Sequence, residues 1–267
     1  MINEFKANDQ IQGWSAIGAP AIIDIRIEMV FVKPVSGIVM KFMTRFYARI
    51  RHWFALALSA MLFFTLAPET LGADPAGADK IIVLGDSLAA GLGVDLSEAF
   101  PALIQSKIEA AGYNDRVVNA GESGDTSADG LGRIDWLLKQ RFDVLILELG
   151  GNDGLRGLTV TSTQTNLQAI IDRVKQKYPK ALIVIAGMQM PPNLGEEYNG
   201  AFRKLYPELA AANHAALIPF LLEGVGGKPE LNQPDQIHPN VEGHKIVADN
   251  VWKVLYPLLQ RMHSHNA

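Results

Sequence analysis

The stretch LGDSLAAGLG (Leu84–Gly93) directly follows the apolar run Lys80–Val83, and its role determines how the rest of the chain is interpreted. A glycine, an acid and a serine at the end of a predicted strand fit three kinds of loop. These are a phosphate-binding loop, a turn that presents a catalytic serine, and an ordinary connection to a helix. A phosphate-binding P-loop needs a lysine followed by serine or threonine, and a dinucleotide-binding loop needs a second glycine two positions after the first. Neither is present here, because no lysine follows until Lys107 and Ser87 stands where the second glycine is needed.

From Lys80 onward, short apolar segments alternate with longer amphipathic segments. Strands rich in Val, Ile and Leu without polar alternation are typical of a parallel sheet that is covered on both faces. The alternation therefore predicts a single α/β domain, a three-layer α/β/α sandwich with a central, mostly parallel five-stranded sheet. The predicted strands are 80–85, 116–120, 143–149, 181–187 and 215–219, and the predicted helices are 97–111, 131–140, 163–178, 198–213 and 241–259.

Small and polar residues follow most of the predicted strands. In such a sheet, ligands bind beyond the carboxyl ends of the strands. The segments expected at that edge are Gly85–Leu88, Asn119–Ser127, Gly150–Gly157, Met188–Gly195 and, at some distance from its strand, Asp235–Asn240. Four of the five place small residues beside a polar group, which favours a functional site at this edge.

A serine turn fits this edge best, although the G-x-S-x-G elbow of α/β-hydrolases is not complete because its fifth position is Ala89. Serine becomes a nucleophile when a histidine takes its proton and a third group orients that histidine. His238 is the candidate base, because Asp235 lies three residues earlier in a loop that contains two prolines. His244 falls in a helical pattern, where a solvent-facing or capping role is the simpler interpretation, and His214 is interpreted as structural at a helix end.

Four segments together resemble the SGNH (GDSL) hydrolase family. Each alone is a modest signal, whereas all four in the right order and spacing over Lys80–Leu259 are highly specific. The segments GGNDGLRG and SGDTS are most similar to those of bacterial periplasmic members of the family that act as thioesterases, arylesterases and lysophospholipases. The resemblance implies the flavodoxin-like SGNH hydrolase fold. The four segments are Gly85-Asp86-Ser87-Leu88, the glycine of Ser123-Gly124-Asp125-Thr126, Gly150-Gly151-Asn152-Asp153, and Asp235-Gln236-Ile237-His238-Pro239.

By this resemblance Ser87 is the nucleophile, His238 is the base and Asp235 is the acid that orients the base. The backbone N–H groups of Ser87 and Gly124, with the side chain of Asn152, form the implied oxyanion hole, in which preorganised donors stabilise the developing negative charge. Gly124 as a plain turn residue and Asn152 as a helix cap are the structural alternatives. No cofactor is implied, and no metal, because the zinc-type H-E-x-x-H spacing is absent. The other polar residues of these blocks are interpreted as hydrogen-bonding turn or cap residues: Asp86, Asp125, Thr126 and Asp153.

Apolar residues at the same edge suggest the substrate. Leu155, Leu158 and Met190 lie on loops beside the implied oxyanion hole, where an acyl chain fits better than a sugar. Met is flexible and polarizable and suits variable apolar ligands. A sugar would call for exposed aromatic platforms, whereas Trp136 and Trp252 lie in helical patterns and are expected in the core. Three functions compete: an acyl esterase or thioesterase, a carbohydrate O-deacetylase of the same family, and a non-catalytic binding module.

Composition excludes several other classes. The chain of 267 residues has a net charge of −4 and no cysteine. Disulfides, thiolate catalysis and Cys-ligated zinc are therefore excluded. No basic patch suggests a nucleic-acid partner. We expect a monomer that acts on a small-molecule acyl ester or thioester.

The segment before Lys80 has the order of a secretory signal peptide. Met40–His52 is basic and without acids, Trp53–Ala67 is continuously apolar, and Pro68 and small residues follow. We expect a signal peptide over 40–78, cleaved after Ala78 or, as second choice, after Ala73. The protein is then periplasmic or secreted, with no membrane span after cleavage. The apolar run is shorter than the ~20 residues of a membrane helix, and an uncleaved anchor is the alternative.

Residues 1–39 show no coherent period and are not expected to join the fold. Because a signal peptide begins near the N-terminus, we interpret them as a non-native or disordered extension and place the native start at Met40 or Met43. An unusually long leader is the alternative. The hydrolase domain is then expected over 79–267.

Overall fold

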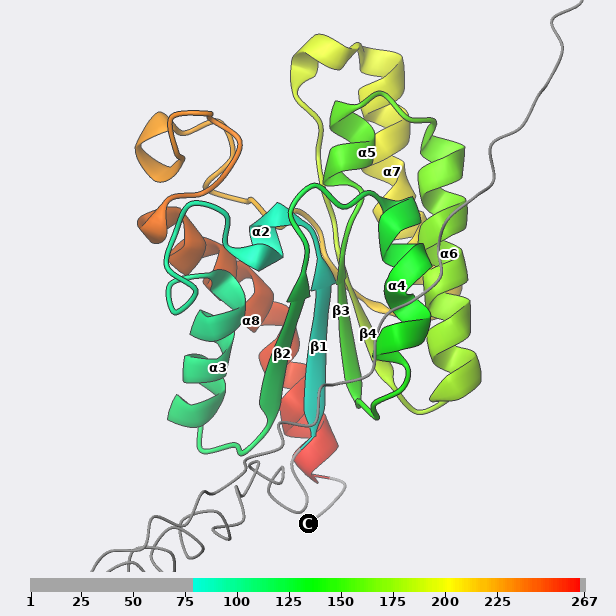
Figure 1. The fold of residues 1–267 in the computed structure, drawn as a ribbon, viewed down its shortest axis with the longest axis vertical. Helices are drawn as coiled ribbons and strands as arrows, with labels where there is room; N and C mark the ends of the chain where they lie inside the picture. The colour runs from blue at the N-terminus through cyan, green and yellow to red at the C-terminus, as the bar shows by residue number, and fades with distance from the viewer. Residues whose placement is uncertain (1–78, 265–267) are drawn as a thin grey trace, which may run out of the picture. The chain divides into compact units, whose positions relative to one another are not determined.

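Five parallel strands form the centre of the computed structural model, which describes residues 79–264 (Figure 1). Their order in the sheet is β2-β1-β3-β4-β5, and all five predicted strands are present. The structure therefore confirms the predicted α/β architecture. The strands are β1 (Lys80–Gly85), β2 (Arg116–Gly121), β3 (Val144–Glu148), β4 (Leu182–Ala186) and β5 (Ala216–Ile218).

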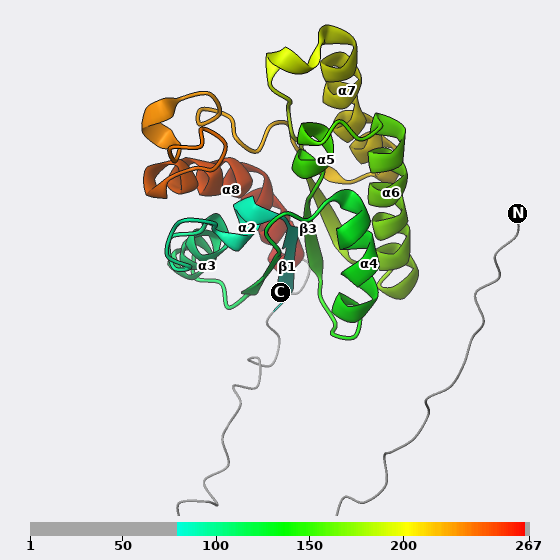
Figure 2. The same ribbon diagram turned by 45° about the horizontal axis from the view of Figure 1, so that its top comes forward.

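Helices cover both faces of the sheet. Figures 1 and 2 show α3 (Phe100–Ala110) and α8 (Val241–Ser264) together on one face. The other face carries α4 (Ser127–Leu137), α6 (Val160–Lys177) and α7 (Glu196–Asn213). Short helices follow two strands directly, and two 3-10 turns lie in longer loops. These are α2 (Ser87–Ala90), α5 (Gly151–Leu155), η1 (Pro192–Leu194) and η2 (Pro229–Leu231).

The five long helices each depart from their predicted bounds by a few residues, and the departures of two have clear local reasons. Helix α4 begins four residues before the predicted start, because Thr126 and Asp129 form a capping box that satisfies N–H groups at its N-terminus. Helix α8 continues past Pro257 to Ser264, where Leu258 and Leu259 remain buried against the sheet. Packing of this apolar face therefore outweighs the hydrogen bond that the proline cannot donate.

The core is formed mainly around the central strands of the sheet. Strands β1, β3 and β4 are buried almost throughout, whereas the edge strand β2 is half-buried to exposed. Trp136 was expected in the core and is 66% exposed, because the buried face of α4 is formed by Gly130, Ile134 and Leu137. Trp252 packs partly buried against the core, as expected.

The predicted signal peptide and N-terminal extension lie outside the described residues. Within residues 79–264, no helix combines the length and the apolar character that a membrane crossing requires.

Candidate active site

The candidate site lies where β1 and β3 end. The chain leaves β1 toward β2 on one side and leaves β3 toward β4 on the other, so the loops that follow these neighbouring strands diverge. A crevice at such a switch of direction is where ligands bind in open α/β sheets. Ser87 follows β1 and Asn152 follows β3, and the loop before α8 brings His238 to the same place.

Three predicted side chains form one hydrogen-bonded chain. The Ser87 Oγ lies 2.8 Å from His238 Nε2, and His238 Nδ1 lies 2.6 Å from Asp235 Oδ2. Ser87 is 7% exposed. The structure therefore brings together the serine, the histidine and the acid that the sequence singled out, in the order that proton transfer from the serine needs.

The loop that carries the acid and the histidine is held by its own backbone. Asp235 Oδ1 accepts hydrogen bonds from the N–H groups of Ile237 at 2.9 Å and His238 at 3.0 Å. Gln236 has a φ of 61°, in the left-handed region, and this closes the tight turn. The N–H of Ile237, followed by the His238 ring, lowers the pKa of Asp235 to about 2. The carboxylate is therefore ionised at all but strongly acidic pH.

Asp86 connects the serine turn to Asn152. Its Oδ1 accepts from the N–H of Leu88 at 3.0 Å and caps helix α2, which confirms its predicted capping role. Its Oδ2 lies 3.3 Å from the side-chain nitrogen of Asn152. Burial is the main cause that raises the pKa of Asp86 to about 6.

The three predicted oxyanion donors differ in whether they already donate a hydrogen bond. Within residues 79–264, no protein group accepts from the N–H of Ser87 or of Gly124. Gly124 has a φ of 91°, which only glycine adopts readily. The side-chain nitrogen of Asn152 donates to the carbonyl of Asp125 at 2.9 Å, besides its longer contact to Asp86. Asn152 can donate to a ligand if the longer contact is released.

Two arginines fix the loop that carries Gly124. Arg156 donates to the Gly124 carbonyl at 2.8 Å. Arg133 donates to Asp125 Oδ2 at 2.7 Å and to the carbonyl of Gly85 at 2.9 Å. Because Gly85 ends β1, Arg133 ties this loop to the strand that carries the serine turn.

The remaining polar residues of the motifs have structural roles, as expected. Thr126 is the N-cap of α4. Asp153 is 1% exposed and accepts hydrogen bonds from the Ser127 N–H and from the Thr163 hydroxyl. It joins α5 to α4 and α6.

An apolar cavity of about 500 Å³ opens beside Ser87. Leu155 and Met190, both predicted to contact substrate, line it, whereas Leu158 does not. Leu158 is 38% exposed and follows the end of α5, outside the cavity lining. The sequence did not indicate the second apolar wall, which comes from the loops after β5 and before α8 and includes Phe220, Leu222 and Ile237.

His244 is buried, not solvent-facing. It is 1% exposed, and its Nδ1 accepts from the N–H of Phe100 at 3.3 Å. It therefore caps the first turn of α3 from α8, so the capping alternative is confirmed and the solvent-facing one is wrong. Burial lowers the pKa of His244 to about 4, and the ring is neutral at pH 7. His214 ends α7 in the left-handed conformation, a structural position as expected.

Residues 83–246, which include all the side chains of this site, match the family model described as "GDSL-like Lipase/Acylhydrolase family". The chain belongs to this family. The resemblance stated from four short segments is therefore confirmed.

Curated relatives of this GDSL-like acylhydrolase are similar over most of their length. Esterase TesA of Pseudomonas aeruginosa is 43% identical over 206 residues, which cover 77% of this chain and 99% of that protein. The thioesterase 1/protease 1/lysophospholipase L1 of Escherichia coli K12 is 43% identical over 185 residues, 69% of this chain and 86% of that protein. A crystal structure of TesA has a TM-score of 0.65 at 42% identity and covers 67% of this chain and 99% of its own.

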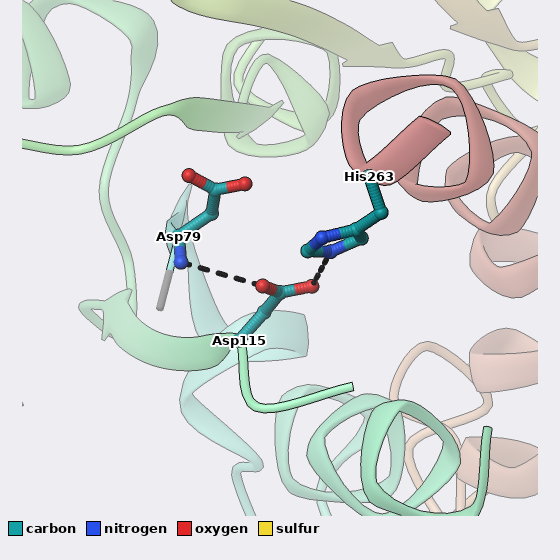
Figure 3. Close-up of side chains that lie close together, drawn as sticks. All are labelled: Asp79, Asp115 and His263. Atoms are coloured by element: carbon teal, nitrogen blue, oxygen red, sulfur yellow. Dashed lines mark hydrogen bonds and ion pairs between the residues drawn. The ribbon is translucent and has the colours of Figure 1, made fainter. Parts of the chain in front are cut away.

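A second group of titratable residues lies at the opposite end of the hydrolase sheet. Asp79, Asp115 and His263 place possible metal-ligand atoms within 4.8 Å of one another (Figure 3). Both oxygens of the buried Asp115 are already hydrogen-bonded, to the Asp79 N–H at 3.3 Å and to His263 Nε2 at 2.9 Å. The His263 ring also stacks on Tyr113. These contacts join the end of α8 to the starts of β1 and β2, which accounts for the group as a structural one.

Proposed function

We propose that this protein is a serine hydrolase that cleaves carboxylic esters and thioesters of the arylesterase, acyl-CoA thioesterase or lysophospholipase type. The observation that carries the proposal is the unbroken hydrogen-bonded chain from Ser87 through His238 to Asp235, with Ser87 at the wall of an apolar cavity. The names of the relatives, an esterase and a thioesterase/lysophospholipase, support the same reaction class.

The chemistry follows from the positions of these groups. The Ser87 Oγ attacks the acyl carbonyl carbon while His238 Nε2 accepts the hydroxyl proton. Asp235 holds the ring through Nδ1 and stabilises its positive charge. The carbonyl oxygen becomes an oxyanion, which takes hydrogen bonds from the free N–H groups of Ser87 and Gly124 and from the side chain of Asn152.

Collapse of this intermediate breaks the bond to the leaving group. His238 donates its proton to the departing alcohol or thiol, and an acyl group remains on Ser87. Water then attacks the acyl carbonyl carbon while His238 Nε2 accepts a proton from it, which forms a second oxyanion. Collapse of this intermediate breaks the bond between the acyl carbon and Ser87 Oγ, His238 returns the proton to Ser87 Oγ, and the carboxylic acid leaves. No cofactor or metal takes part in any step.

The cavity supports an acyl chain as the group that binds. Its lining is largely apolar, with side chains that are flexible or aliphatic on one wall and aromatic or aliphatic on the other. The lining includes Leu155, Met188, Met190, Phe220, Leu222 and Ile237. An alkyl chain gains about 0.8 kcal/mol for each methylene that it buries. We therefore propose medium or long acyl groups in place of acetyl.

We further propose that the enzyme is exported to the periplasm or the medium. The basic, apolar and small-residue order of 40–78 supports removal of this segment as a signal peptide.

Hydrolysis assays test the proposed activity. Wild-type protein and Ser87→Ala are compared on p-nitrophenyl esters from acetyl to dodecanoyl, on acyl-CoAs of the same lengths, and on an O-acetylated sugar. We expect wild-type turnover of esters and thioesters and none by the variant. Turnover of the acetylated sugar alone would establish the carbohydrate deacetylase instead, and no turnover of any substrate would leave the non-catalytic binding module.

A further inference from the structure

A buried acid lies directly beneath the serine turn. Glu148 is the last residue of β3, in an otherwise apolar strand, and its side chain is 0% exposed. Its register partner in the sheet is Gly85, and a Cβ at Gly85 would overlap Glu148 Oε2. The glycine that begins the serine turn therefore makes room for this carboxyl group.

The carboxyl group of Glu148 binds the backbone on both sides of Ser87. Its Oε2 accepts from the N–H of Asp86 at 3.1 Å, and the N–H of Ala89 also lies against the carboxyl group. The N–H of Leu88, between them, is capped by the side chain of Asp86. The N–H groups of Asp86 and Leu88 thus donate to side-chain carboxyls, and that of Ala89 faces the Glu148 carboxyl, whereas the N–H of Ser87 has no acceptor within residues 79–264.

We propose that Glu148 is a positioning residue, which fixes the N–H and the Oγ of Ser87 for ester hydrolysis by binding the backbone N–H groups of Asp86 and Ala89. The proposal rests on the proposed function, because it assigns Glu148 a part in the same reaction. Glu148 acts through the turn and does not touch the reacting atoms. Its effect should appear in the rate of the chemical steps and not in ground-state binding of the acyl chain.

The surroundings of Glu148 favour the uncharged acid. In the part of the chain that the structure describes, its Oε1 is buried and has no hydrogen-bond partner. Burial, followed by the neighbouring carboxyl of Asp86, raises the pKa of Glu148 well above its usual range. Tyr206 is a further titratable group that interacts with Glu148, and burial raises the pKa of that phenol as well. An ionised carboxylate here would be uncompensated and would repel the oxyanion that forms above it.

An uncharged acceptor can be imitated by an amide, which gives the test its design. Glu148→Gln keeps a carbonyl oxygen for the two N–H groups, Glu148→Leu removes it at similar volume, and Glu148→Asp withdraws it by one methylene. Val144→Ala, on the same strand at its far end, is the control for loss of stability alone. For each folded variant, kcat and KM on p-nitrophenyl butyrate, the rate of phosphonylation by a fluorophosphonate and the thermal midpoint are measured.

We expect Glu148→Leu and Glu148→Asp to lower kcat and the phosphonylation rate by roughly ten- to a hundredfold with little change in KM, because a small misplacement of reacting groups has effects of that size. Glu148→Gln should recover most of both rates, and Val144→Ala should lower the thermal midpoint alone. If Glu148→Leu does not fold, Glu148→Asp and Glu148→Gln carry the comparison.

Two results would overturn the proposal: rates for the Leu or Asp variants within twofold of Val144→Ala, or a Gln variant as slow as the others. Failure of the proposed function is a separate result, because it would appear as a wild-type protein that hydrolyses no ester. The phosphonylation rates would still measure the positioning of Ser87 in that case.

Discussion

The length preference of the enzyme should depend on Leu155. This side chain lines the cavity and is 43% exposed. Going from a butanoyl to an octanoyl ester adds four methylenes, which contribute about 3 kcal/mol if all leave water. Because the wall is half exposed, we expect about half of this gain in the transition state, which is a preference of roughly fifteenfold in kcat/KM.

Leu155→Ala should reduce this octanoyl-to-butanoyl ratio by about threefold and leave kcat/KM on the acetyl ester within twofold, because acetyl does not reach that wall. The matched control is Leu158→Ala, which removes a similarly exposed leucine three residues later that does not line the cavity. Initial rates on p-nitrophenyl acetate, butanoate and octanoate give the octanoyl-to-butanoyl ratio and the acetyl kcat/KM of the wild type and of both variants. An acetyl optimum in the wild type, or equal flattening by both variants, would refute the placement of the acyl chain.

Three further predictions concern the base, the pH dependence of stability and the N-terminus. His238→Ala should remove nearly all activity, whereas Asp235→Ala should leave measurable turnover because the acid orients the ring and transfers no proton; a fully active His238→Ala would show that the base is another residue. The folded state holds the pKa of His244 at about 4, below the 6.5 of a free imidazole, so only the unfolded chain takes up this proton as pH falls through that window. Between pH 7 and pH 4, the free energy of unfolding measured by urea titration should therefore fall by roughly 2–3 kcal/mol more for the wild type than for His244→Gln. Equal falls in the two proteins would contradict this account of His244. N-terminal sequencing of the exported protein should find a start directly after Ala78, whereas a full-length form in the inner membrane would support an anchor.

The sequence was sufficient for the fold and for the side chains that carry a chemical signature. Buried parallel strands have continuous apolar segments, and β1 was predicted with its observed bounds. Ser87, Asp235 and His238, which the structure joins in one hydrogen-bonded chain, could be singled out because the proposed nucleophile, acid and base each need a particular residue type. Helices α2 and α5 were not predicted, because helices of four and five residues are too short to show a period.

The remaining features depend on tertiary contacts that a sequence pattern does not contain. In the sequence, Glu148 is a single acid in an apolar strand. The register of β1 against β3 is what places it beneath the serine turn. His244 lies on the buried face of α8 and accepts from α3, a contact between helices far apart in the chain. Leu155 is the last residue of the short helix α5 and lines the cavity, whereas Leu158 follows the end of that helix and does not line it.

The central claim is that Ser87 is the nucleophile, and a covalent adduct tests it most directly. The wild-type protein is treated with a serine-directed fluorophosphonate, and the adduct is counted by intact mass and located by peptide mapping. Ser87→Ala and His238→Ala are treated in parallel. We predict one adduct per chain, on Ser87, with none on Ser87→Ala and strongly slowed labelling of His238→Ala, because the hydroxyl then has no base at 2.8 Å. Labelling at another residue, or normal ester turnover by Ser87→Ala, would contradict the account.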